Sequence, residues 1–391
     1  MSWKRWDIPL FIVTLLLVGL GLTMVYSSSA VFSESRFGDG FYFFKKSFLF
    51  SGFGFGALFL AYRIPYEKWR KAVYPVLLGT CLLMILVLFS GLGLSGGGAV
   101  RWLHLGPLRF QPSELAKLAM VLFMAYSMAK KLDRMKVFLV GVFPHLIIGM
   151  FIIGLILLQK DLGSAVIIGG VVWMMMFIGG ARVTHLTALL LATLPLGYYL
   201  ILKEGYRLQR ILSFLDPWKD RYGSGFQVIQ SYLAFNEGGF LGKGLGSGQQ
   251  KLFYLPEAHT DFIFAVIGEE LGFIGVLFVV ALFVFFCYRG FLVAVRTQDL
   301  FGRYLAFGIT TLIGLQALCN MAVVTGLLPT KGLVLPFISY GGSSLVITMF
   351  SVGILLNISR YESGYRMWGN GGAPVSRDRT GRDVRGNTAR A

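Results

Sequence analysis

The sequence is poor in charged residues. Only 14% of its 391 residues are Asp, Glu, Lys or Arg, whereas 55% are hydrophobic. Soluble domains carry about a quarter charged residues, so this composition excludes a soluble enzyme and a disordered chain. Apolar stretches of about 20 residues recur along the chain, and each is long enough to cross about 30 Å of hydrocarbon. The sequence therefore predicts a polytopic helical membrane protein.

Cysteine, histidine and acidic residues are also scarce. The three cysteines lie within or beside apolar stretches, which excludes a disulfide framework. The four histidines lack the spacing of metal ligands, so no metal site held by the protein is predicted. The 19 acidic residues face 36 basic ones, for a net charge of +17. In a membrane protein this excess indicates cytoplasmic loops and anionic lipid, and no nucleic-acid partner is predicted.

Hydropathy predicts an all-α fold with about ten transmembrane helices. If the N-terminus is inside, most basic residues lie on the cytoplasmic side, so both termini are predicted to be cytoplasmic. The first apolar stretch is too long for a signal peptide and is predicted to remain as a helix. The predicted spans are residues 8–28, 45–62, 73–92, 113–130, 138–158, 163–180, 186–203, 262–287, 304–328 and 343–359.

The domain organisation follows from these spans. Residues 1–359 form one membrane domain, and residues 360–391 form a basic, disordered tail. A long outer loop, about 204–261, joins the seventh and eighth helices. Loops of this length are functional or disordered, and its aromatic residues argue against disorder. The loop is predicted to fold back onto the membrane surface as short amphipathic helices.

The stretch LPEAHTDFIFAVIGEELG (255–272) carries the first cluster of polar residues. Asp261, preceded by His259, stands at the expected first turn of the eighth helix, where capping of that helix is the alternative to a chemical role. Glu269 and Glu270 are expected about 12 Å deeper. Carboxylates at that depth point to function, or to pairing with a buried base. The nearby glycine-rich GKGLGSG (242–248) matches no nucleotide motif and is interpreted as a flexible loop.

Three other clusters lie near the outer helix ends. In WLHLGPLRFQPSELAKL (102–118), Glu114 and Lys117 share one helix face, so a self-contained ion pair is the alternative to substrate binding, and Arg109 adds charge. In LLQKDLGSA (157–165), Asp161 either caps a helix or binds substrate. In LLPTKGLVLPFISYGGSS (327–344), prolines and glycines predict irregular backbone that lines a cavity or is buried. Its Lys331 is the lone charge, with snorkelling as the alternative.

These residues together predict a cavity that opens to the outer leaflet. Cations near the interface suit a lipid-linked phosphate, and an outward-facing carboxylate suits a general base. The residues alone indicate a membrane enzyme or transporter that acts on an anionic lipid.

The same stretches, in order with VYSSSA (25–30) and the 206–235 segment, resemble the SEDS family of cell-wall polymerases over about residues 8–359. EAHTDFIF and LPTKGL are more similar to its cell-division than to its elongation members. The resemblance implies a peptidoglycan glycosyltransferase that polymerises lipid II on the outer face of the bacterial cytoplasmic (inner) membrane, at the division septum. It also implies a class B penicillin-binding protein and other divisome proteins as partners.

The resemblance assigns roles to particular residues. Asp261 matches the family's essential aspartate and would be the general base of an inverting transfer with undecaprenyl pyrophosphate as leaving group. No protein-held metal is implied, although a divalent cation, Mg²⁺ or Mn²⁺, is a candidate for helping to neutralise the pyrophosphate. Substrate contacts are expected from Glu114, Lys117, Asp161, Arg210, His259, Lys331 and Ser343, with supporting roles for Glu269, Glu270 and Arg109.

One position departs from the family pattern. Lys160 stands where the family usually has proline, before Asp161, and is expected to loosen the turn and add a cation. Two rival functions also stay open. A lipid II flippase would need a polar path through the bilayer, which Glu269 and Glu270 alone would extend. A non-catalytic scaffold for the penicillin-binding protein would tolerate loss of Asp261.

Overall fold

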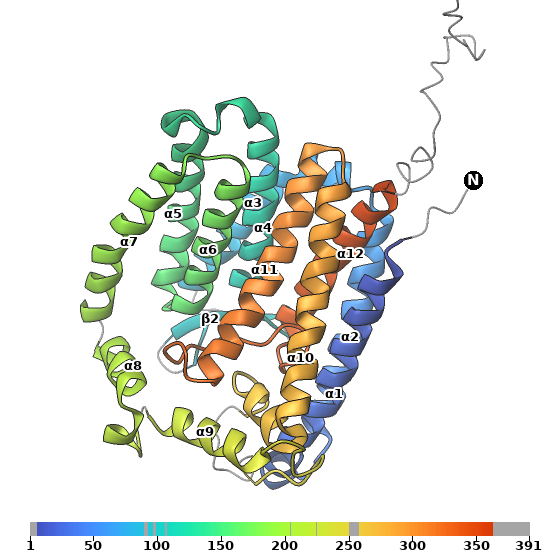
Figure 1. Cartoon of the computed structure of the whole chain (residues 1–391), viewed down its shortest axis with the longest axis vertical. Helices are drawn as coiled ribbons and strands as arrows, with labels where there is room; N and C mark the ends of the chain where they lie inside the picture. Colours follow the sequence, from blue (N-terminus) through green and yellow to red (C-terminus); the bar gives the residue numbers. More distant parts are fainter. Residues whose placement is uncertain are drawn as a thin grey trace, which may run out of the picture.

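The computed structural model describes residues 6–89, 93–96, 99–105, 108–203, 205–223, 225–249 and 258–362. Helices dominate this part of the chain (Figure 1). The long helices are α1 (Ile8–Phe37), α2 (Tyr42–Arg63), α3 (Tyr66–Phe89), α4 (Pro112–Lys130), α5 (Phe143–Leu158), α6 (Leu162–Ile178), α7 (Val183–Lys203), α10 (Ile263–Arg296), α11 (Leu300–Val324) and α12 (Gly342–Glu362). The shorter elements are β1 (Gly93–Gly96), β2 (Ala99–Leu105), β3 (Leu108–Phe110), η1 (Leu132–Arg134), η2 (Phe138–Val142), α8 (Gly205–Leu215), η3 (Pro217–Asp220) and α9 (Phe226–Gly238).

Each of the ten segments predicted to span the membrane forms a helix. Within the described residues, seven helices are long and apolar enough to cross a membrane: α1, α2, α3, η2 with α5, α10, α11 and α12. The apolar runs of α6 and α7 are shorter, and Glu114 and Lys117 make α4 less apolar. Large apolar side chains such as Phe48, Leu78 and Met150 are exposed on the helices. The helix positions are confirmed, while the number of crossings stays a prediction.

Helix α4 lies at the centre of the bundle. Nearly all of its residues are buried, and it contacts α3, α6 and α11. Around this centre, α12 packs closely on α2 because small residues line their interface. A Cβ placed on Gly353 would lie 2.2 Å from the Leu58 carbonyl oxygen, so a side chain there would push the two helices apart.

A small sheet departs from the all-α prediction. Strands β1, β2 and β3 form an antiparallel sheet in that order between α3 and α4. Leu103 pairs with Phe110, and the register of β1 against β2 shifts after Leu94. The strands have only 4, 7 and 3 residues, so they give no alternating pattern long enough to reveal them.

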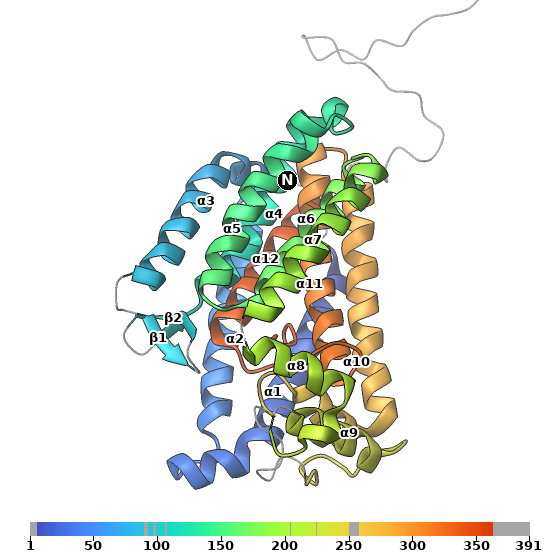
Figure 2. The same cartoon turned by 90° about the vertical axis from the view of Figure 1, so that its left-hand side faces the viewer.

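The long loop between α7 and α10 contains the two short helices α8 and α9, as predicted. Figures 1 and 2 show both helices at one end of the bundle, the end at which the sheet also lies. On α8, Leu208, Leu212 and Leu215 are exposed whereas Arg207 is buried. The predicted tail lies almost entirely outside the described residues, which end at 362.

Helix α10 is broken near its start. Gly272 has φ 64° and ψ −164°, which divides the helix into segments 263–271 and 273–296. A Cβ placed on Gly272 would lie 2.3 Å from the backbone nitrogen of Gly242, so the preceding loop passes through the break. Only glycine adopts this backbone geometry at such close approach. Figure 1 shows the short first segment beside the lower end of the long one.

Candidate active site

The connection between α11 and α12, residues 325–341, organises the candidate site. Two prolines and several apolar residues hold it in an irregular, largely buried conformation. Its backbone and side chains bond to α8, to α11 and to the turn before α10. The prediction of irregular backbone here is confirmed, and its contacts bring distant segments together.

Asp261 lies in the turn 258–262, directly before α10. Phe262 is the N-cap residue of that helix, so Asp261 lies one residue before the N-cap, and helix capping stays the alternative to a chemical role. The Asp261 carbonyl accepts a hydrogen bond from Asn320 Nδ2 at 2.9 Å. A Cβ placed on Gly332 would lie 3.2 Å from Asp261 Oδ2, so the carboxylate faces the α11–α12 connection. The side chain is partly exposed, as a general base must be.

His259 holds this turn against the first two helices. Its ring centroid lies 4.5 Å from that of Phe43, 5.8 Å from that of Tyr340 and 5.9 Å from that of Phe32. Its carbonyl also accepts the Tyr340 N–H at 2.9 Å. These contacts fix the backbone next to Asp261; a direct contact with substrate stays a prediction.

Two cations meet on the α11–α12 connection. Within the described residues the Lys331 side chain makes no ion pair or hydrogen bond, while its backbone carbonyl accepts the Leu333 N–H at 2.9 Å. Burial lowers the pKa of its ammonium group, an effect that the nearby Cys319 thiol opposes. Arg210 of α8 donates Nη1–H to the neighbouring Thr330 carbonyl at 3.3 Å. A lysine that has no counter-charge within the described residues, on the connection that Asp261 faces, is available to an anionic ligand.

Glu114 and Lys117 form the predicted ion pair. Lys117 Nζ lies 2.8 Å from Glu114 Oε1, and the two side chains are 2% and 8% exposed. Lys117 also donates to Gln316 Oε1 at 2.9 Å, and Gln316 Nε2 donates to the Val334 carbonyl at 3.2 Å. The pair is therefore linked to the α11–α12 connection through one glutamine.

Asp161 is the N-cap residue of α6, which was the alternative to substrate binding. Its Oδ1 accepts the Ser164 N–H at 3.1 Å. Its Oδ2 accepts hydrogen bonds from Gln111 Nε2 and Ser113 Oγ, both at 3.3 Å. The carboxylate is buried and accepts three hydrogen bonds, which tie α6 to the start of α4. A substrate contact from Asp161 stays a prediction.

Lys160 adopts a conformation that proline cannot. Its φ of 58° lies in the left-handed region, whereas a proline ring holds φ near −65°. Arg101 donates hydrogen bonds to the carbonyls of Gln159 and Lys160, so the turn is held rather than loosened. The Lys160 side chain is exposed, and within the described structure it makes no hydrogen bond or ion pair with Asp161.

Arg109 and Ser343 lie at the edges of this arrangement. Arg109 is exposed on β3. Burial raises the pKa of the Tyr340 hydroxyl, and the positive charge of Arg109 opposes that shift. Ser343 is buried in the first turn of α12, directly after the connection.

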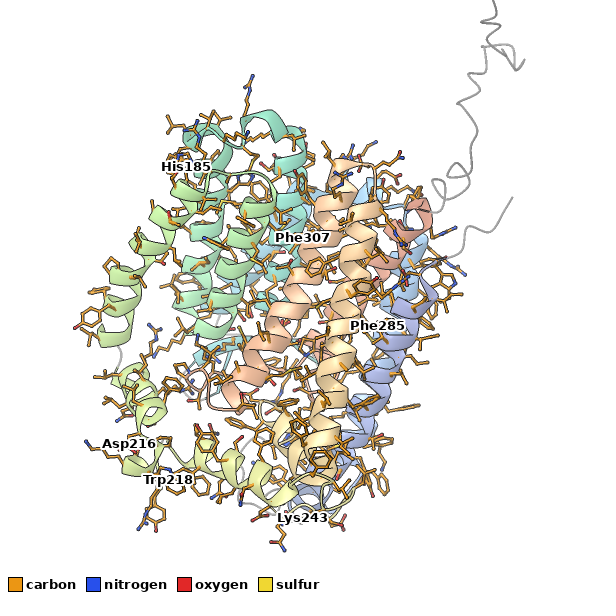
Figure 3. The ribbon with its side chains drawn as sticks, in the orientation of Figure 1. His185, Asp216, Trp218, Lys243, Phe285 and Phe307 are labelled. Carbon is orange, nitrogen blue, oxygen red and sulfur yellow. The ribbon has the colours of Figure 1, made fainter. Side chains whose placement is uncertain are left out.

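The expected place of Glu269 and Glu270 is wrong. Glu269 lies 4.0 Å from Lys243 Nζ, and Figure 3 shows Lys243 at the end of the molecule that also carries Trp218. The carboxylates therefore lie toward the α9 end and not deeper in the bundle. The physical reason is the break at Gly272, because the first segment of α10 runs toward that end before the chain turns back.

Three polar residues of the site were missed from the sequence. Gln316 and Asn320 lie on one face of α11, and Asn320 Nδ2 donates to the Asp261 and Leu333 carbonyls. Ser339 Oγ donates to the Thr260 carbonyl at 2.6 Å. Two amide side chains four residues apart in an apolar helix were a detectable signal. Ser339 was not detectable, since its partner is 79 residues away.

The described residues offer no ligand set for a metal held by the protein. No group of three or more His, Cys, Asp or Glu side chains lies close enough together among them. Asp161, the most enclosed carboxylate near the connection, already accepts three hydrogen bonds.

Comparisons with known proteins identify the family. A family model described as "Cell cycle protein", which groups FtsW, RodA and SpoVE, matches residues 8–364. The chain belongs to this family, the SEDS family. Its fold therefore places it among multi-pass membrane proteins, as the apolar helices require.

Relatives and solved structures agree with this assignment. A protein of Geobacter metallireducens named "Probable peptidoglycan glycosyltransferase FtsW" is 49% identical over 92% of this chain and 96% of the relative. "Stage V sporulation protein E" of Bacillus subtilis is 44% identical over 91% and 97%. A chain from a structure described as "Structural coordination of polymerization and crosslinking by a peptidoglycan synthase complex" matches with a TM-score of 0.75, at 30% identity over 92% of this chain and 99% of that one. RodA of Thermus thermophilus matches with a TM-score of 0.65, at 27% identity over 92% and 98%.

Proposed function

We propose that this protein is a peptidoglycan glycosyltransferase that polymerises lipid II into glycan strands during division. The names of its SEDS relatives support a role in cell-wall synthesis, and several of them are FtsW proteins. One observation carries the chemistry. A partly exposed carboxylate, Asp261, faces a backbone segment whose Lys331 has no counter-charge within the described structure.

In the proposed reaction Asp261 is the general base. Its carboxylate takes the proton from the 4-hydroxyl of the acceptor GlcNAc as that oxygen attacks the anomeric carbon of MurNAc. The new glycosidic C–O bond forms while the bond to undecaprenyl pyrophosphate breaks, so the configuration changes from α to β. One base suffices for such a displacement, and no covalent intermediate on a carboxylate is needed.

The leaving pyrophosphate requires positive charge. Lys331 and Arg210 are proposed to neutralise it, with Lys117 behind them through Gln316. Glu114, Asp161 and His259 are proposed to orient these cations or the sugar. A requirement for Mg²⁺ or Mn²⁺ would then reflect the pyrophosphate of the substrate, since the described side chains do not fit a metal.

The proposed topology has ten crossings, with both termini in the cytoplasm of a bacterium. Helices α8 and α9, the sheet and the site then lie on the outer side, where lipid II is polymerised (Figures 1 and 2). A class B penicillin-binding protein and other divisome proteins are the proposed partners, at the septum. A relative in a peptidoglycan synthase complex supports such a pairing.

The rival functions lose support. The flippase alternative relied on Glu269 and Glu270 to extend a polar path inward, and both lie toward the α9 end instead. A scaffold would not need a partly exposed carboxylate such as Asp261. No described feature favours either alternative over the glycosyltransferase.

The test is polymerisation of labelled lipid II by purified protein bound to its cognate penicillin-binding protein. Asp261→Asn keeps the size of the side chain and removes the base, so wild type should make glycan chains and the variant none. Asp39→Asn is the matched control, because Asp39 forms an exposed pair with Lys45 away from the connection. Equal product from Asp261→Asn and wild type would refute the role of Asp261. No product from wild type in an assembled complex would refute the proposed function.

A further inference from the structure

Two motifs without an assigned role, VYSSSA (25–30) and GKGLGSG (242–248), meet at an acidic pair in α10. Ser27 Oγ lies 2.7 and 2.6 Å from the two carboxylate oxygens of Glu270 and donates to them. On the other side, the Gln249 N–H donates to Glu269 Oε1 at 2.5 Å. Both glutamates are 0% exposed. Buried carboxylates are stable only where hydrogen bonds compensate for lost hydration, and here two separate segments supply those bonds.

The backbone of the 239–249 loop completes the hydrogen bonding of the broken helix. In an intact helix, the carbonyls of Glu269 and Glu270 would accept the amides four residues later. They accept the N–H groups of Lys243 and Gly244 instead, at 3.0 and 2.9 Å. The two amides that follow Gly272 donate to the loop carbonyls of residues 239 and 240, at 3.0 and 3.3 Å. The loop is therefore an integral part of the break and not the flexible loop that its glycines suggested.

We propose that Glu269 and Glu270 are positioning residues for Asp261. Glu269 holds the 239–249 loop at the break in α10, and Glu270 holds the residues before the break against α1. Together they set the direction of segment 263–271, at whose other end Asp261 faces the α11–α12 connection. Neither glutamate reaches the reacting atoms. This inference rests on the proposed function only for its effect on catalysis, since its effect on structure can be measured separately.

The test compares Glu269→Gln and Ser27→Ala with wild type in the complex with the penicillin-binding protein. Glu269→Gln keeps the shape of the side chain and removes its charge. Ser27→Ala removes only the hydroxyl that donates a hydrogen bond to Glu270. Both variants should therefore fold. The expected result is a fall in kcat of about tenfold, with KM for lipid II unchanged within about twofold, because the base is displaced while binding remains. Asp39 is an exposed carboxylate on the same side, so Asp39→Asn should leave both kcat and KM unchanged.

Hydrogen–deuterium exchange gives a second reading that does not need activity. In both variants, faster exchange is expected in peptides covering 239–249 and also 258–271, the segment that carries Asp261. Faster exchange confined to 239–249, or unchanged kcat in both variants, would overturn the positioning role. If wild type itself makes no glycan, the proposed function fails, and the exchange of the 258–271 peptide alone decides whether the pair positions that segment.

Discussion

Asp261 and the pair Glu269–Glu270 lie within ten residues of one another, yet their surroundings differ completely. Asp261 is partly exposed and faces a connection whose Lys331 side chain has no counter-charge within the described residues. Glu269 and Glu270 are fully buried and accept hydrogen bonds from two other segments. A carboxylate that still has access to solvent can exchange protons, whereas a buried one with satisfied oxygens holds the chain in place. Proximity in sequence therefore does not imply a shared role.

The proposed difference between Asp261 and the two glutamates is tested most strongly by moving the carboxylate of Asp261 without removing it. Asp261→Glu adds one methylene and displaces the base by about 1.5 Å, so kcat for lipid II polymerisation should fall about 100-fold. The kcat of Asp261→Asn should fall further, by about 100- to 10,000-fold, since this change removes general-base catalysis. Single-turnover assays of the assembled complex measure both. Activity of Asp261→Glu near that of wild type would mean that the carboxylate position is not critical.

A third buried carboxylate, Glu114, tests whether burial always means structure. Lys117→Met would leave Glu114 buried and unpaired, so the free energy of unfolding should fall by about 3–5 kcal/mol. Glu114→Gln combined with Lys117→Met removes both charges and should recover most of that loss. Thermal unfolding in lipid nanodiscs measures the recovery.

The recovered double variant then separates structure from function at this pair. If Lys117 supports the pyrophosphate as proposed, the folded double variant should polymerise lipid II about tenfold more slowly than wild type. A stable double variant with full activity would place Glu114 and Lys117 with Glu269 and Glu270, as residues that only hold helices together.

Lys331, the lysine of the α11–α12 connection, should have a smaller effect on polymerisation, and this effect should depend on pH. Burial lowers the pKa of Lys331 below its ordinary value of about 10.4, so the cation is lost as the pH rises through the lowered value. Polymerisation should therefore decline at alkaline pH, and Lys331→Ala should reduce it about 10- to 100-fold at neutral pH. Lys331→Arg keeps its charge and should move the alkaline decline to higher pH.

Stability should change with pH in the opposite sense. The unfolded chain binds the proton on Lys331 more tightly than the folded chain does, so this lysine contributes a rise in stability between its lowered pKa and about 10.4. The rise should be absent in Lys331→Ala. An alkaline decline in activity that is identical in wild type and Lys331→Arg would contradict a role for this cation.

The sequence predicted the helices well and their breaks poorly. Long apolar stretches and the i, i+3 spacing of Glu114 and Lys117 are local signals, and the structure contains both the helices and the ion pair. The break at Gly272 has no local signal, because a glycine in an apolar stretch is equally typical of close helix packing. Its cause is a loop about 30 residues earlier, and contacts at that distance leave no periodic trace. For the same reason the depth of Glu269 and Glu270 was misplaced.

Lys160 should give the smallest effect, because its exposed side chain has no described partner in the proposed site. Its left-handed backbone follows the end of α5, where glycine is the usual residue. Lys160→Gly should raise the free energy of unfolding by about 0.5–1 kcal/mol, since it relieves the strain of a side chain at positive φ. Lys160→Pro should lower it, because φ near −65° is incompatible with this turn. Polymerisation by Lys160→Gly should equal that of wild type. A loss of activity in this stabilised variant would show that exposure at the rim, and not the contact with the α11–α12 connection, selects the charges that act on substrate.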